Sequence, residues 1–219
     1  MEAVANSPDQ PASMAHPAYV QLAFPEYRKG QTYQLAYPIT GPQIVVYRTQ
    51  DFAGYENENQ RDYPRQVNGL RELIEKGIDP GHCAQPLAGD EQALPFLPLV
   101  HAAPIFCAQA QPAEFQGGKG IRYITYYAQD VSPAVEWFVF YTFQGLTDDG
   151  QYYISAVFPI RTNILPDQPP AAGSEPDFAA QAALLREQVA QINAQAADEF
   201  TPSLRVLDEL IAGVQVPGD

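Results

Sequence analysis

The sequence predicts an α+β domain, in which a mainly antiparallel sheet of six or seven strands is packed by C-terminal helices. Three observations support this class: short alternating apolar segments bounded by proline and glycine, an aromatic-rich hairpin at 138–160, and two amphipathic patterns near the C-terminus. A further helix is expected between the early strands and the central meander. With 219 residues, 46% of them apolar, the chain can form one domain with a sizeable core, which we expect to span 18–216.

The first stretch of the chain, residues 1–17, is expected to be a disordered arm or linker. Its sequence, MEAVANSPDQPASMAHP, is rich in alanine, proline and serine and has no apolar period. In an exported protein such a stretch often follows a removed signal peptide or a lipid-anchored cysteine, so an upstream lipid anchor is one interpretation. A flexible cytoplasmic terminus is the other.

Three early strands are predicted, at 18–24, 32–39 and 42–49, because these segments are apolar or alternating and are bounded by proline and glycine. A helix is predicted next, starting near Pro64, which a first turn tolerates, and ending at Gly77. Its apolar residues follow helical spacing: Val67, Leu70, Leu73 and Ile74.

The segment 94–109 is apolar, but three prolines cross it, so at best it contributes edge strands and an ordered loop. The following segments, 113–117 and 121–129, are predicted to be paired strands joined by a tight turn in the sequence GKG.

The turn sequence TDDG sets the predicted register of the hairpin. It fits a three-residue connection, with a type I turn followed by Gly150 in the left-handed region. Thr147 then opposes Gln151, and Phe140 faces Phe158 on the more apolar side. The second side, which carries Val139, Tyr141, Phe143 and Tyr153, is expected to be covered incompletely.

Two C-terminal helices are predicted, at about 176–198 and 202–214. The second begins with Thr201 as N-cap and Pro202 at the first helical position, and both are expected to cover the side of Phe140 and Phe158. The apolar seam of the first helix consists of Phe178, Ala182, Leu185, Val189, Ile192 and Ala196. The second helix buries Leu204, Leu207, Ile211 and Val214.

The two cysteines, Cys83 and Cys107, are predicted to form a disulfide. It would close a loop of about 25 residues, worth roughly 3–4 kcal/mol in the chain-entropy treatment. Two buried reduced thiols are the alternative, and the three histidines do not complete a zinc pattern. Because disulfides persist in oxidising compartments, we expect an extracytoplasmic location: cell surface, periplasm or secreted.

Three segments, LPFLPLVHAA, FQGGKGIRYITYYAQ and FYTFQGLTDDGQYYISAVFPI, together resemble a family of exported, often lipid-anchored bacterial proteins of uncharacterised function. The resemblance covers roughly residues 40–166. It implies an extracytoplasmic location and carries over no catalytic residues. The order of elements is also similar in topology to the fold of photosystem-associated PsbP proteins and Mog1.

The formal net charge of −14 disfavours nucleic-acid partners, and no apolar run reaches the length of about 20 residues that a membrane span needs. No metal or cofactor is predicted. Glu56, Glu58 and Asp62 lie close enough to hold calcium but lack the order of an EF-hand loop, so a solvated loop explains them better. The GGKG segment is too short for a phosphate loop.

The predicted function is a non-enzymatic exported or surface-anchored domain that binds a protein, peptide or apolar small ligand through an aromatic face of its sheet. The expected contact residues are Tyr141, Phe143 and Tyr153, with Tyr123 and Tyr127 from the neighbouring strand. The alternative is a hydrolase-like enzyme of unfamiliar design that uses His101 with a nearby carboxylate, although the sequence has no G-x-S-x-G elbow. A pocket that encloses His101 with a second polar group in hydrogen-bond reach would favour the enzyme, whereas a shallow aromatic groove without ionisable groups would favour binding.

Overall fold

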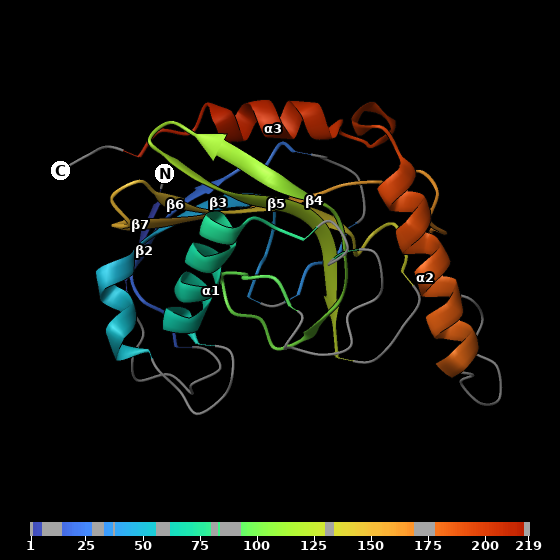
Figure 1. The fold of residues 1–219 in the computed structure, drawn as a ribbon, viewed down its shortest axis with the longest axis horizontal. Helices are drawn as coiled ribbons and strands as arrows, with labels where there is room; N and C mark the ends of the chain where they lie inside the picture. The colour runs from blue at the N-terminus through green and yellow to red at the C-terminus, as the bar shows by residue number, and fades with distance from the viewer. Residues whose placement is uncertain are drawn as a thin grey trace.

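The fold is built on one seven-stranded antiparallel sheet, with helices on both faces (Figure 1). The computed structural model describes residues 2–5, 15–27, 33–36, 38–55, 62–79, 83, 93–129, 134–168 and 178–216. The strands are β1 (Glu2–Val4), β2 (Tyr19–Ala23), β3 (Gln43–Arg48), β4 (Ala103–Phe115), β5 (Gly118–Ala128), β6 (Phe140–Thr147) and β7 (Tyr152–Pro159), in the spatial order β1-β2-β3-β7-β6-β5-β4. The α-helices are α1 (Tyr63–Lys76), α2 (Phe178–Ala194) and α3 (Leu204–Ala212), with short 3-10 helices η1 (Thr49–Gly54) and η3 (Ala197–Glu199). The predicted α+β class is confirmed.

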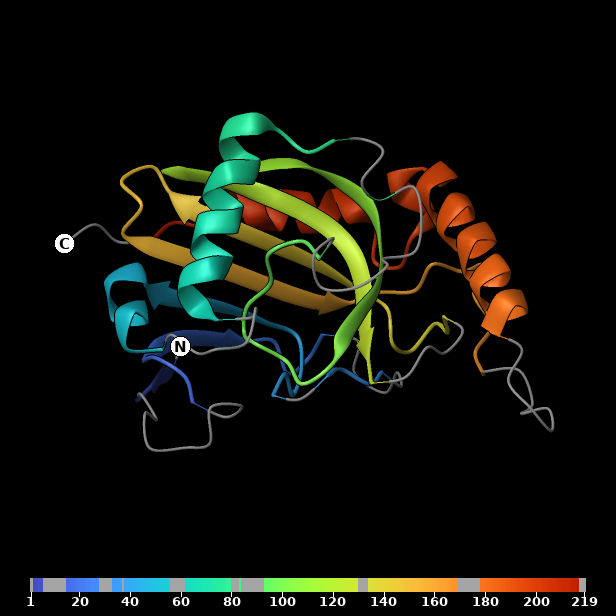
Figure 2. The ribbon, with the colours of Figure 1, turned by 60° about the horizontal axis from the view of Figure 1, so that its bottom comes forward.

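The sheet separates two hydrophobic cores. On one side, here called the α3 face, the apolar residues of α2 and α3 pack against β4 to β7; on the other, the α1 face, α1 and η1 cover the sheet. Figure 2 shows α1 crossing the near face of the strands while α3 lies behind them and α2 stands at the end of the sheet. The α3-face core includes Phe143, Ile154, Phe158, Leu185, Val189, Ile192, Leu204, Leu207 and Ile211. The α1-face core includes Val67, Leu70, Phe96, Tyr123, Phe140, Tyr153 and Val157.

The register of the β6–β7 hairpin differs from the predicted one by one residue. Tyr141 lies opposite Phe158 and Leu146 opposite Tyr153, so Phe140 does not face Phe158 as the sequence predicted. Gly150 has the expected positive φ of 70°. The connection is longer than the predicted three residues because the Asp149 carboxylate accepts the N–H of Gln151, which keeps Gln151 in the turn.

This shift exchanges the side chains between the two faces, because successive residues of a strand point in opposite directions. Tyr141 and Phe143 lie with Phe158 beneath the C-terminal helices, and Phe140 lies on the α1 face. The predictions that the C-terminal helices cover Phe140, and that the second side is incompletely covered, are therefore wrong: Phe140 and Tyr153 are 1% and 0% exposed.

The helix boundaries follow the predicted signals in part. Asp62 caps α1 by accepting the N–H of Arg65 at 2.8 Å, and Gly77 ends the helix with a φ of 80°. The predicted cap of the last helix is wrong, because the side chain of Ser203 caps α3 while Thr201 pairs with Arg161 in an isolated antiparallel bridge.

Three strand predictions need correction. The described residues of 32–39 form no strand, and Glu2–Val4 pairs with β2 inside the stretch expected to be a disordered arm. The turn between β4 and β5 lies at Gln116 and Gly117, since GKG belongs to β5. Glycine is needed at Gly120 because a Cβ there would collide with the backbone of Gln144 in β6.

Cys83 and Cys107 form a disulfide, as the sequence predicts. Cys107 lies within β4, and the backbone carbonyl of Cys83 accepts a hydrogen bond of 2.8 Å from the side chain of Asn193, near the end of α2. The disulfide and this hydrogen bond together connect the segment around Cys83 to both the edge strand and α2.

The turn geometry gives a testable prediction. The Thr147 hydroxyl accepts the N–H of Tyr152 and donates to Asp149, so Thr147→Val should lower the free energy of unfolding by about 1 kcal/mol. Asp148→Ala, an exposed change in the same turn, should cost less than about 0.5 kcal/mol. Chemical denaturation of both variants measures the two values, and equal losses would contradict the observed turn.

Candidate functional site

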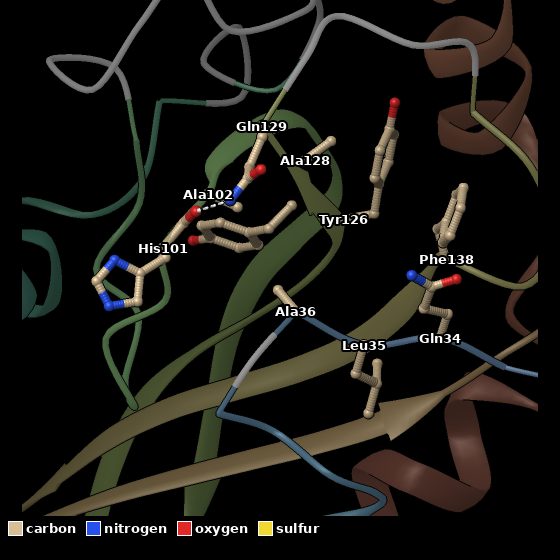
Figure 3. Close-up of a pocket in the computed structure, with 10 residues that line it drawn as sticks. Gln34, Leu35, Ala36, His101, Ala102, Tyr126, Ala128, Gln129 and Phe138 are labelled. Carbon is tan, nitrogen blue, oxygen red and sulfur yellow. Dashed lines mark hydrogen bonds between the residues drawn. The ribbon is translucent and has the colours of Figure 1, made fainter. Parts of the chain in front are cut away.

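A cavity of about 430 Å³ opens where β5 ends and β4 begins. Four segments meet there: residues 34–36, residues 101–102 just before β4, the end of β5, and Phe138 just before β6 (Figure 3). The described residues that line it are Gln34, Leu35, Ala36, His101, Ala102, Tyr126, Tyr127, Ala128, Gln129 and Phe138.

Backbone contacts bring these separate segments together. The pairing of Ala103 with Ala128 places the residues just before β4 beside those just after β5. There the Gln129 side chain donates to the carbonyl of His101 at 3.4 Å. On the other side, the N–H of Gln34 donates to the carbonyl of Trp137 at 2.7 Å. This hydrogen bond holds the segment 34–36 next to Phe138.

The aromatic wall of the cavity is packed into both hydrophobic cores. Tyr126 is 1% exposed and its ring stacks on Phe138, with a centroid distance of 6.0 Å and an interplanar angle of 20°. Tyr127 is half-buried and packs against Phe96 at 4.7 Å and Phe140 at 6.2 Å. Because these rings also support the folded core, the wall is formed before any ligand arrives.

The polar groups of the described lining are two amides, one imidazole and the hydroxyls of Tyr126 and Tyr127. Gln34, His101 and Gln129 are exposed, and Figure 3 shows Gln34 beside Phe138 and His101 at the opposite side of the cavity. Among the described lining residues there is no aspartate, glutamate, lysine or arginine. The described lining therefore combines an apolar wall with hydrogen-bonding groups and includes no carboxylate, lysine or arginine.

The structure separates the five aromatic residues predicted to form a binding face. Tyr141 and Phe143 lie beneath α3, and Tyr123 and Tyr153 lie on the α1 face; all four are at most 2% exposed. Burial raises the pKa of the Tyr123, Tyr141 and Tyr153 hydroxyls well above the ordinary value. The predicted open aromatic surface does not exist because both faces of the sheet are covered, and only Tyr127 of the five reaches the cavity.

His101, the centre of the enzymatic alternative, does line the cavity. The described lining residues include no carboxylate, serine, threonine or cysteine that would complete a hydrolytic site with it. Glu56 and Glu58 lie outside the described residues, while Asp62 is the N-cap of α1. No group of three or more potential metal-binding side chains occurs within the described ranges.

Sequence reasoning missed the part of the cavity formed by Leu35, Ala36, Tyr126 and Phe138. The sequence pattern assigns the segment 34–36 to a strand, but the segment is held by the backbone hydrogen bond of Gln34 to Trp137, about a hundred positions away, and by packing of Leu35 on the α1-face core. No local sequence pattern encodes such a contact. Phe138 is recognisable as an aromatic residue of the hairpin, whereas its stacking on Tyr126 depends on the tertiary structure.

A second cluster of polar groups, around Arg122, connects α3 to the sheet. The guanidinium of Arg122, with its side chain 3% exposed, lies 3.4 Å from the Asp208 carboxylate and donates to the carbonyl of Gln109. The Tyr141 hydroxyl donates to the same carboxylate at 3.0 Å. Burial raises the pKa of Asp208, and the attraction of Arg122 offsets this only in part.

No family model, curated protein or solved structure matches this chain. Within the described part of the chain, every helix is too short or too polar to cross a bilayer.

The Asp208 carboxyl gives a pH-dependence prediction. Because its folded-state pKa is raised, its contribution to stability is fully present below the unfolded pKa of about 3.9 and is lost as the pH rises through the folded pKa. The difference in unfolding free energy, wild type minus Asp208→Asn, should therefore decrease as the pH rises above about 4.

Denaturant titrations at several pH values measure this difference, with Asp148→Asn as the control for losing one carboxylate from an exposed position. A difference that grows with pH would contradict the prediction and would mean that the attraction of Arg122 exceeds the cost of burial.

Proposed function

We propose that this chain is a non-enzymatic, extracytoplasmic binding domain whose cavity at the end of β5 holds an apolar group of a protein, peptide or small ligand. The observation that supports this most directly is the lining: aromatic and aliphatic side chains form the wall, and amide and imidazole side chains lie at the rim. Ligand sites in proteins commonly have this composition.

The size of the cavity is compatible with this role. A volume of about 430 Å³ lies within the usual range of roughly 300–1,000 Å³ for small-molecule sites. It suits one ring system or one large side chain. A ligand larger than that would have to extend from the cavity onto the surface around Gln34 and Gln129.

One observation supports the proposed location: the disulfide between Cys83 and Cys107 is typical of oxidising compartments. The resemblance of the central segments to exported bacterial proteins stays a prediction, and a lipid anchor upstream of residue 1 is part of this proposal.

The proposal is tested by filling the cavity. Ala36→Trp adds an indole to the lining of the cavity and should weaken binding of the uncharged fluorescent probe N-phenyl-1-naphthylamine at least tenfold, because the added ring occupies the space that the probe needs. Ala190→Trp makes the same change at an exposed position of α2 and should leave binding unchanged.

Fluorescence titration measures both affinities, and thermal unfolding verifies that each variant is folded. Wild-type protein that does not bind the probe, or equal affinities of the two variants, would overturn the assignment of binding to this cavity.

A further inference from the structure

We propose that the group accepted by this cavity is an uncharged aromatic ring with one neutral polar substituent, such as a phenol or an indole. This inference rests on the proposed function and adds the chemical class of the ligand. Three features of the described lining support it: its lack of charge, the way its own rings are packed, and the position of its polar side chains.

The charges of the site and of the chain disfavour ionic ligands. Burying an ion is costly unless an opposite charge or several hydrogen bonds compensate it. The described lining has no carboxylate to pair with a cation and no lysine or arginine to pair with an anion. The formal net charge of −14 adds long-range repulsion of anions. An uncharged group avoids both costs.

The arrangement of the rings favours an aromatic ligand over an aliphatic one. A cage for an alkylammonium group needs several open ring faces. Here Tyr126 and Phe138 stack on each other, and Tyr127 packs against Phe96 and Phe140. Tyr126 is 1% exposed, so the partly buried Tyr127 and Phe138 supply most of the ring surface that a ligand can contact. Aromatic rings that meet edge to face or in an offset stack gain affinity beyond area burial, a gain that a saturated ring of the same size lacks.

The small side chains leave room for a flat group beside this wall. Ala36, Ala102 and Ala128 line the cavity, and Figure 3 shows Ala36 and Ala128 on different sides of the space next to Tyr126. At the rim, the amide of Gln34 and the imidazole of His101 are exposed and can hydrogen-bond to a hydroxyl or an indole N–H. A ring with one such substituent can pack its ring against the apolar wall and hydrogen-bond through its substituent to the polar rim.

Competition against N-phenyl-1-naphthylamine tests the inference with matched probes. 4-Methylphenol should displace the dye at a concentration at least tenfold lower than 4-methylcyclohexanol, which has a similar size and polarity but no aromatic ring. Benzylamine and 4-methylbenzoate, which are charged at neutral pH, should also be at least tenfold weaker than 4-methylphenol.

Two variants connect the preference to the cavity. Ala36→Trp binds too little dye for competition, so its affinity for 4-methylphenol is measured directly by isothermal titration calorimetry and should fall at least tenfold, while the exposed Ala190→Trp should not change it. Phe138→Leu keeps an apolar side chain but removes the ring, so the preference for 4-methylphenol over 4-methylcyclohexanol should fall to about threefold or less.

The outcomes separate this inference from the proposed function. If 4-methylcyclohexanol or a charged probe competes as well as 4-methylphenol in wild type, and Ala36→Trp weakens its binding in calorimetry, the cavity binds ligands and the aromatic class is wrong. If the dye does not bind the cavity at all, the proposed function itself is wrong.

N-acetyltyrosinamide distinguishes the source of the ring. Competition at least as strong as that of 4-methylphenol supports a ring carried by a peptide, and weaker competition supports a free small molecule.

Discussion

The pairing of β6 with β7 decides which side chains each helix layer covers. Both strands lie inside the sheet and are buried on both faces, so a shift of one residue would exchange the two cores. The turn fixes the register through the Thr147 hydroxyl, which accepts the N–H of Tyr152, and the Asp149 carboxylate, which accepts the N–H of Gln151. As a result, Phe143 lies beneath α3 and Tyr153 beneath α1. The positions of the other strands and of the cavity depend on this arrangement.

A buried amide connects this hairpin to the cavity. The side-chain oxygen of Gln144 accepts from the N–H of Leu97 at 3.0 Å and from the Tyr153 hydroxyl at 2.8 Å, and its nitrogen donates to Ser155 at 3.0 Å. These hydrogen bonds satisfy the polar groups of β6 and β7 and hold the backbone of Leu97 against the sheet. Phe96, next to Leu97, packs against Tyr127. The same segment continues to His101, so the core network positions one side of the cavity.

The sequence predicts what local signals encode. Helix α1 has a proline in its first turn and a glycine after its last, β2 and β3 are short apolar segments, and the two cysteines pair. The predicted hairpin register is wrong because the register depends on hydrogen bonds of the Thr147 and Asp149 side chains, which compete with the backbone for the same N–H groups. In the cavity, Tyr127 and His101 are candidates that the sequence alone identifies. Tyr127 and His101 line the same cavity as Ala36 and Phe138 because distant segments contact one another. No short sequence pattern contains such contacts.

The rings of the cavity belong to the two cores as well as to the site, and this has a consequence for binding. Tyr126 is part of the α3-face core, while Tyr127 packs on the α1-face core. The entropy cost of fixing these rings is therefore met when the chain folds, so a ligand that enters has little of the wall to order. A rigid wall discriminates by shape, since it cannot rearrange to fit a different group. Removing the rings of Tyr126 or Tyr127 would disturb the fold and the site together, whereas Ala36 lines the cavity with a small side chain that contributes little to either core.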